Sequence, residues 1–204
     1  MNKKIFITLA GLVVLGALVY YFYPTPNKLT PVVQDTTTLA GMQTGNAPWI
    51  AETSHLRERL DAIGLPALKV EGQALHIHEH IDIFIGGKPV VIPKNIGVNE
   101  ADRFISPIHV HDDTAVIHIE SPAVQTFTLG QFFDVWGVSF TKNSIGAYQN
   151  SGDKILRVFV NGIEVKTDPR LINLEAHQEI VITYGKDSEL PNPIPATYKF
   201  AQGL

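Results

Sequence analysis

Residues 75–85 alternate between two kinds of side chain, and this alternation constrains the fold more than any other feature of the chain. The segment reads Leu-His-Ile-His-Glu-His-Ile-Asp-Ile-Phe-Ile. Because neighbouring side chains of a β-strand point to opposite faces of its sheet, the pattern predicts a strand with two different faces. One face is aliphatic, belongs in a core and is interrupted only by Glu79. The other face carries His76, His78, His80, Asp82 and Phe84.

Residues 108–111 and 115–120 predict the two strands of a second hairpin, which turns at Asp112-Asp113. In both strands aliphatic residues alternate with polar ones. Because the aliphatic residues must share the core face, the connecting turn is expected to contain two or four residues. That register places four polar side chains on one face: His109, His111, His118 and Glu120.

The two groups of histidines together predict a metal site. Two imidazoles two positions apart on a strand lie roughly 6.5–7 Å apart and can converge on one ion, whereas a third, four positions along, joins them only if the strand is bulged. A His-x-His pair with a further histidine from the neighbouring strand suits Zn²⁺ or Cu²⁺. We therefore predict one or two sites for Cu²⁺ or Zn²⁺, drawn from six histidines: His76, His78, His80, His109, His111 and His118.

Acidic side chains accompany these histidines. Segment 76–120 has a net charge of −4, which is the whole net charge of the chain and favours a cation. Two other interpretations of the histidines stay open: a pH-responsive surface, because imidazoles titrate near pH 6.5, or ordinary structural histidines. His55 and His177 lie outside the pattern and are expected to be structural. Four carboxylates are candidates for outer ligands or for groups that orient an imidazole N–H: Glu79, Asp112, Asp113 and Glu120.

The signatures of an enzyme are weak. A zinc-dependent hydrolase or hydratase needs three ligands, an open coordination position and a neighbouring acid or base, and residues 109–120 contain those residue types. The chain contains neither the His-Glu-x-x-His helix motif of metalloproteases nor a Gly-x-Ser-x-Gly motif. It has no cysteine and two methionines, which excludes a blue-copper site of the usual form and disfavours Cu(I) binding by thioethers. A non-enzymatic role is therefore favoured.

The N-terminus predicts a membrane anchor. Residues Ile5 to Phe22 are apolar and uncharged, follow Lys3 and Lys4, and run into a cluster of tyrosines. A helix of this length rises roughly 27 Å, which spans the hydrocarbon layer of a bilayer. Lysines before the span and tyrosines after it orient the remaining chain to the extracytoplasmic, periplasmic or outer, side. An uncleaved signal-anchor over residues 1–23 is preferred to a cleaved signal peptide, because no small-x-small site follows closely.

The rest of the chain predicts an α+β fold, mostly antiparallel and with few short helices. Residues 24–48 are rich in Pro, Thr, Asn and Gln and are expected to form a flexible linker. We expect a division into residues 49–122, a helix with His-rich hairpins, and residues 123–204, a second subdomain. A single compact domain over residues 49–204 is the alternative.

Several local elements are expected. A helix is predicted over residues 49–63, and another over residues 129–136 with Thr128 and Gln131 as a capping box. The turn signals Gly86-Gly87 and Asn161-Gly162 predict hairpins. The strands expected beside these turns and further along the chain cover residues 90–92, 138–141, 155–160, 163–166 and 179–184.

Four motifs carry a resemblance to a known family. They are His-Ile-His-Glu-His-Ile-Asp-Ile-Phe-Ile from His76, Ile-His-Val-His-Asp-Asp from Ile108, Ile-His-Ile-Glu-Ser-Pro from Ile117 and Thr-Leu-Gly-Gln-Phe-Phe-Asp-Val-Trp-Gly from Thr128. Over about residues 70–185 the chain resembles an uncharacterised family of small membrane-anchored or secreted bacterial and archaeal proteins. This resemblance implies no particular function.

A second resemblance concerns residues 128–185. Their Thr-Leu-Gly helix start, Val-Asn-Gly hairpin and closing Glu-Ile-Val-Ile-Thr-Tyr-Gly strand are similar to β-grasp-like ligand-binding modules. That resemblance implies a fold for the second subdomain and leaves its ligand open, because a fold does not imply a function.

We therefore expect a membrane-anchored extracytoplasmic protein that binds or delivers copper or zinc, or serves as a metal-dependent accessory protein. The alternative is a structural or interaction subunit without metal, which docks to a membrane complex through its β-grasp-like half. Phe132, Phe133 and Trp136 are candidates for such docking, although their shared helical face favours a place in the core. The net charge of −4 without a basic cluster argues against a nucleic-acid partner.

Overall fold

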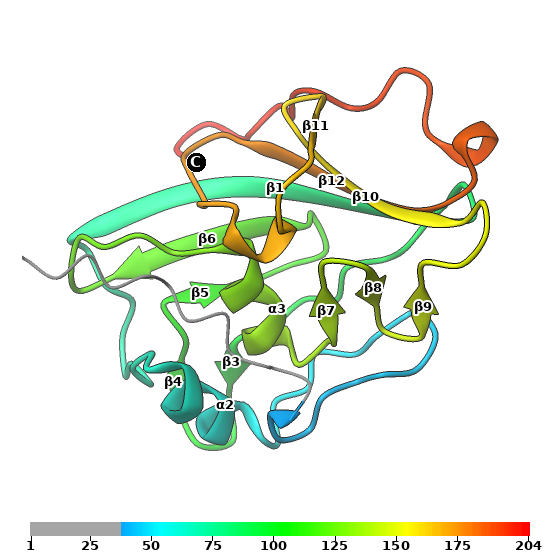
Figure 1. Ribbon diagram of the computed structural model, residues 1–204. Coiled ribbons are helices and arrows are strands. Elements are labelled where there is room, and N and C mark those ends of the chain that lie inside the picture. The colour runs from blue at the N-terminus through cyan, green and yellow to red at the C-terminus, as the bar shows by residue number, and fades with distance from the viewer. Residues whose placement is uncertain (1–37) are drawn as a thin grey trace, which may run out of the picture. The chain divides into compact units, whose positions relative to one another are not determined.

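One seven-stranded mixed sheet organises residues 38–204, the part of the chain that the computed structural model describes (Figure 1). The order across the sheet is β11-β10-β12-β1-β6-β5, with β2 beside β1. β1 and β12 are parallel, and the other neighbouring pairs of this sheet are antiparallel. The strands are β1 (Leu75–Ile85), β2 (Lys88–Pro89), β5 (Ile108–His109), β6 (Val116–Ser121), β10 (Ile155–Val160), β11 (Ile163–Val165) and β12 (Glu179–Gly185).

The remaining elements are short and confirm the predicted α+β class, mostly antiparallel with few helices. α3 (Leu129–Trp136) packs next to β5, and α2 (Leu56–Ile63) packs against α3 (Figure 1). The other elements are β3 (Val98–Asn99), β4 (Phe104–Ile105), β7 (Phe140–Thr141), β8 (Ser144–Ile145), β9 (Tyr148–Gln149) and the 3₁₀ turns η2 (Pro169–Leu171) and η3 (Asp187–Glu189).

The predicted signal-anchor over residues 1–23 lies outside the described residues. Residues 24–37 of the predicted linker also lie outside them. From residue 38 onward, none of the helices has the length and apolar character needed to cross a membrane. The described residues belong to one compact unit, and their main sheet takes strands from both sides of Pro122.

β1 has the two faces that its alternation predicts. Its core-facing Ile81 and Ile83 are buried together with aliphatic residues of β5, β6, β10 and β12. The two ends of β1 have different neighbours on the sheet: residues 75–80 pair with β6, and residues 80–85 pair with β12. The polar face of β1 is therefore divided between two environments, which decides where its histidines lie.

α3 begins and ends as predicted. Thr128 Oγ1 accepts a hydrogen bond from the backbone N–H of Gln131 (3.3 Å), and Gln131 Oε1 accepts one from the backbone N–H of Thr128 (3.0 Å). The aromatic residues Phe132, Phe133 and Trp136 are fully buried in the core. These three rings therefore do not form a docking surface.

The first predicted helix is shorter than its apolar pattern suggested, because it starts at Leu56 instead of residue 49. Trp49 is buried by tertiary contacts rather than by a helical face: its ring meets that of Trp136 edge-on at 5.9 Å. The indole N–H of Trp136 also donates a hydrogen bond to the backbone carbonyl of Ile50 (2.9 Å), which holds this segment in a non-helical path.

The predicted hairpin turns are present, with shorter strands beside some of them. Both residues of Gly86-Gly87 and of Asn161-Gly162 have positive φ, as tight two-residue hairpin turns require. The return strand after Gly87 is β2, which stops at Pro89, a residue that has no N–H to donate to a ladder. Of the strand predicted over residues 138–141, β7 covers only the last two residues.

Candidate metal centre

Strand register brings histidines from three neighbouring strands into one row. His78 of β1 lies opposite His118 of β6, and His118 lies opposite His109 of β5. The centroids of the His78 and His118 rings are 4.5 Å apart, and those of His109 and His118 are 5.5 Å apart. The next row places His76 opposite Glu120. The predicted register of the second hairpin, with His109 and His118 on the same face, is the observed one.

Two further contacts complete a group that we call the imidazole cluster. The Nε2 atoms of His76 and His78 are 3.2 Å apart, and those of His109 and His111 are 3.0 Å apart. Such pairs form a hydrogen bond when one nitrogen is protonated, and they also match the roughly 3.3 Å between ligand atoms of a tetrahedral Zn²⁺ site. The cluster consists of His76, His78, His109, His111, His118 and Glu120.

The cluster contains two overlapping sets of four ligands. In each set, one ligand atom per residue lies within 4.8 Å of every other. Both sets contain His118 and Glu120, which occupy the middle strand β6. They differ in the outer pair, which is His76 with His78 from β1 or His109 with His111 from β5 and the loop after it.

Burial keeps the inner imidazoles neutral. Loss of hydration lowers the pKa of His109 to about 3 and that of His118 to about 4, with smaller contributions from the neighbouring imidazoles. The pKa of His78 is lowered for the same reasons. The neutral imidazole is the form that binds a metal. The side chains of His76 and His111 are 52% and 41% exposed, so they form the solvent-facing edge.

Glu120 belongs to the cluster itself instead of serving as an outer group. Its Oε1 lies 3.2 Å from His76 Nε2 and 3.3 Å from His118 Nδ1. Burial raises the pKa of Glu120, and the nearby carboxylate of Glu71 raises it further. Glu71 also lies beside the cluster on the other side, with its Oε1 3.4 Å from His111 Nε2. The sequence did not indicate Glu71, because the loop before β1 has no periodic pattern.

The other predicted outer groups do not hold the imidazoles. The Nδ1 atom of His109 lies 2.9 Å from the backbone carbonyl of Ser106, which leaves Nε2 for the cluster. Asp112 accepts a hydrogen bond from the backbone N–H of Thr114 (2.9 Å) and shapes the turn. Its negative charge also offsets a small part of the lowering of the His118 pKa. Asp113 is exposed in the same turn.

Glu79 faces away from the cluster, because it lies on the core side of β1 between His78 and His80. It is fully buried, and neither of its carboxylate oxygens has a hydrogen-bond partner among the described residues. Burial raises its pKa to about 9, so the carboxyl group is protonated near neutral pH. Glu79 therefore cannot orient the imidazoles or act as acid or base for them.

His80 is separate from the cluster, because its half of β1 pairs with β12. Its Nδ1 lies 2.8 Å from Glu179 Oε2, and its ring stacks on Tyr198 with centroids 3.8 Å apart. The two histidines expected to be structural are not members of the cluster: His55 contacts Glu52, whereas His177 contacts the backbone carbonyl of Leu204 and donates its backbone N–H to the carbonyl of His78 (2.7 Å).

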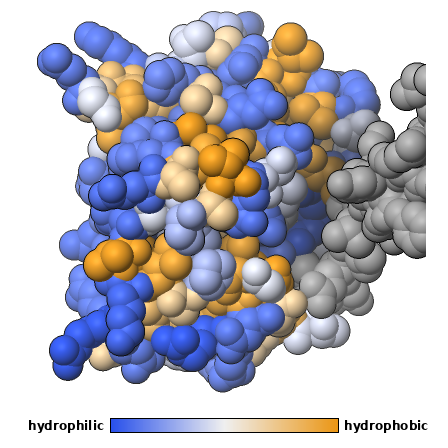
Figure 2. Space-filling model, turned by 90° about the vertical axis from the view of Figure 1, so that its left-hand side faces the viewer, coloured by the Kyte–Doolittle hydropathy of each residue, from blue (hydrophilic) through white to orange (hydrophobic). Residues whose placement is uncertain are grey.

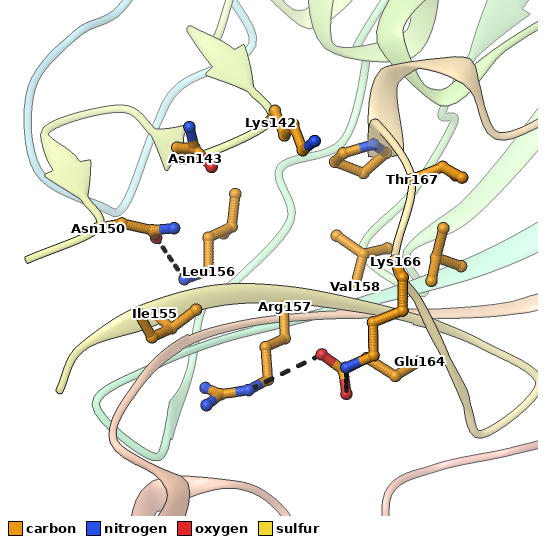
Figure 3. Close-up of a pocket in the computed structure, with 12 residues that line it drawn as sticks. Lys142, Asn143, Asn150, Ile155, Leu156, Arg157, Val158, Glu164, Lys166 and Thr167 are labelled. Carbon is orange, nitrogen blue, oxygen red and sulfur yellow. Dashed lines mark hydrogen bonds and ion pairs between the residues drawn. The ribbon is translucent and has the colours of Figure 1, made fainter.

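A pocket of about 190 Å³ beside β10 is a different candidate location for a site (Figure 3). Figure 3 shows Lys142 and Asn143 on one side of the β10 strand and the Arg157 guanidinium on the other. Glu164 pairs with both Arg157 and Lys166, and Asp187 also pairs with Arg157, so these carboxylates offset part of the positive charge of the pocket. No histidine lines it, and the metal-binding chemistry of the described residues lies instead on the sheet face.

Comparison with known proteins does not assign this arrangement to a family. Protein-family models, curated proteins and solved structures gave no match to the chain. The functional interpretation therefore depends on the geometry of the imidazole cluster.

Proposed function

We propose that this chain is a membrane-anchored extracytoplasmic protein that binds a copper or zinc ion at the imidazole cluster, in metal binding or delivery or as a metal-dependent accessory protein. The observation that carries the proposal is the convergence of five imidazoles and one carboxylate, with ligand atoms within 4.8 Å of one another in each set. Imidazole nitrogen and carboxylate oxygen without thiolate are ligands suited to Zn²⁺ and Cu²⁺. The predicted signal-anchor over residues 1–23, with its apolar segment Ile5 to Phe22, supplies the membrane part of the proposal.

The shared ligands favour delivery over a permanent structural ion. Because both sets contain His118 and Glu120, the two sets differ only in the outer pair of residues that an ion must exchange to pass from one to the other. Structural zinc sites are closed and four-coordinate, whereas this cluster has an exposed imidazole in each set, His76 in one and His111 in the other. An open edge with alternative ligands supports uptake and release.

A zinc-dependent hydrolase or hydratase is the second candidate, and the position of Glu71 favours it. This side chain is about half-exposed and lies 3.4 Å from His111 at the open edge of the cluster. A carboxylate beside a metal with an open coordination position is the usual type of general base. The described residues offer no second feature that selects a substrate, so metal binding without catalysis remains the main proposal.

The interaction-subunit alternative has less support. Its candidate aromatic residues are buried, and Figure 2 shows one side of the molecule, where hydrophobic residues form small patches separated by hydrophilic ones. Large continuous apolar patches are the usual mark of a protein-binding surface. This alternative predicts a folded protein that contains no metal.

Metal content tests the proposal directly. The full chain, untagged and in detergent, is dialysed against a trace mixture of divalent metals and analysed by mass spectrometry. Relative to the wild type, the variant that combines His118→Leu with Glu120→Gln is expected to lose about one equivalent of copper or zinc, because both sets lose two ligands. Replacing one outer pair, His76 and His78 by Leu, is expected to retain the ion with affinity weakened more than roughly tenfold.

Two controls make the result interpretable. His55→Leu removes a histidine outside the cluster and should leave the metal content unchanged. The variant with His76→Leu and His111→Leu changes only the two exposed imidazoles, so it cannot disturb the core, and it should weaken binding as well. A folded wild-type protein without metal, or equal metal loss in His55→Leu, contradicts the proposal.

A further inference from the structure

The second half of the polar face of β1 carries another group of potential ligands. His80 and Asp82 project from β1, and Glu179 begins β12, which runs parallel beside it. One ligand atom from each of these three residues lies within 4.8 Å of the other two. The His80 Nδ1 atom is 2.8 Å from Glu179 Oε2. This group shares no residue with the imidazole cluster.

Glu179 supplies an independent sign that a ligand is needed here. The residue is 1% exposed, and its Oε1 atom has no hydrogen-bond partner among the described residues. A buried carboxylate oxygen without a donor is costly, and such groups in native structures usually meet a water, an ion or a ligand. The carboxylate of Asp82 lies beside it and adds a second negative charge, which favours a cation over a neutral ligand.

The C-terminal segment holds His80 in place. Tyr198 stacks on the imidazole with an interplanar angle of 7°, and Phe200 meets Tyr198 edge-on at 5.0 Å. This packing fixes the ring with Nδ1 directed at Glu179 and covers it from solvent, since His80 is buried. Asp82 is half-buried and leaves the group an approach from solvent.

We propose that His80, Asp82 and Glu179 form a second divalent-cation site, separate from the imidazole cluster. One imidazole and two carboxylates make a harder ligand set than five imidazoles with one carboxylate, so this site suits Zn²⁺ and, more than the imidazole cluster does, a hard ion such as Mn²⁺. The inference does not rest on the proposed function, because the two groups have no ligand in common.

Zinc stoichiometry separates the two sites. The full chain in detergent is titrated with Zn²⁺ by equilibrium dialysis, alongside a cluster-disabled variant that combines His118→Leu with Glu120→Gln. We expect two equivalents for the wild type and one for the cluster-disabled variant. Adding Glu179→Gln to that variant is expected to abolish the remaining equivalent, since the substitution keeps the shape of the side chain and removes its charge.

Matched variants decide the outcome. Glu175→Gln makes the same change at an exposed position of the loop before β12 and should leave both equivalents in place. Asp82→Asn, at a half-buried position that tolerates the change, should weaken the second equivalent more than tenfold. The inference is overturned if the cluster-disabled variant binds no zinc, or if Glu179→Gln binds as Glu175→Gln does. A single equivalent lost only with Glu179→Gln would instead contradict the proposed function and support this site.

Discussion

Glu79 places a carboxyl group inside the apolar core, on the face of β1 opposite the imidazole cluster. Its pKa in the folded protein is about 9, compared with an ordinary value of 4.5, so the folded state binds a proton that the unfolded state releases. The stability that this bound proton contributes to the folded state is fully present below pH 4.5 and is lost as the pH rises toward 9. Each pH unit in this range lowers the free energy of unfolding by about 1.4 kcal/mol.

The substitution Glu79→Gln is expected to remove this dependence, because glutamine has the same shape and no charge to bury. Between pH 5 and pH 7 the free energy of unfolding of the wild type should fall by about 3 kcal/mol relative to the variant. Urea unfolding of residues 35–204 with a chelator present, at both pH values, measures the difference. A constant difference between the two proteins would show that Glu79 is charged in the folded state.

Individual site residues were predictable only where strand periodicity placed them. Alternation along β1 and β6 put His76, His78 and His118 on one face, and strand pairing then brought them together. Glu179 was not predicted as a partner of His80, because the two are separated by 99 positions and meet only through the parallel pairing of β1 with β12. The contact of Glu71 depends on a loop, which has no periodicity to read.

At the scale of elements, the capping box of α3 gives a quantitative prediction. Thr128→Ala removes the acceptor for the backbone N–H of Gln131 at the start of a helix whose apolar face is fully buried. Loss of such a cap costs about 1 kcal/mol in the free energy of unfolding. Thermal or urea unfolding of residues 35–204 measures it, and Thr126→Ala, at an exposed position of the same loop, is the control. Equal stability of the two variants would contradict the role of the cap.

Elements with complete local signals were predicted well, and those fixed by tertiary contacts were not. β1, β10 and α3 have the predicted bounds, because alternation or capping marks both ends. α2 starts later than predicted. The prediction took the apolar Trp49 as part of a helical face, whereas Trp49 is buried by its contact with Trp136 outside the helix. The β-grasp-like resemblance of residues 128–185 stays a prediction, and any such module would need β1 as well, since β12 pairs with it.

At the scale of the whole chain, the membrane anchor stays a prediction with a direct test. We expect the full chain to sediment with membranes and to resist extraction by high salt, because the apolar span enters the bilayer. A variant in which a cleavable signal sequence replaces residues 1–23 should still be exported and should appear in the soluble fraction. A full chain found in the soluble fraction would contradict the anchor.

Metal binding should also stabilise the fold as a whole, because the cluster joins β1 to the hairpin of β5 and β6 further along the chain. The ligands come from β1, β6 and the β5 region, so unfolding any one of these strands breaks the site. A ligand that binds only the folded state at a hundred times its Kd stabilises that state by about 2.7 kcal/mol. Because each kcal/mol shifts the Tm of a domain of this size by about 2–4 °C, we expect added Zn²⁺ to raise the Tm of residues 35–204 by roughly 5–11 °C. The shift should be unchanged in His55→Leu and strongly reduced in the variant with His118→Leu and Glu120→Gln. Equal shifts in both variants would mean that zinc stabilises the protein from somewhere other than the imidazole cluster.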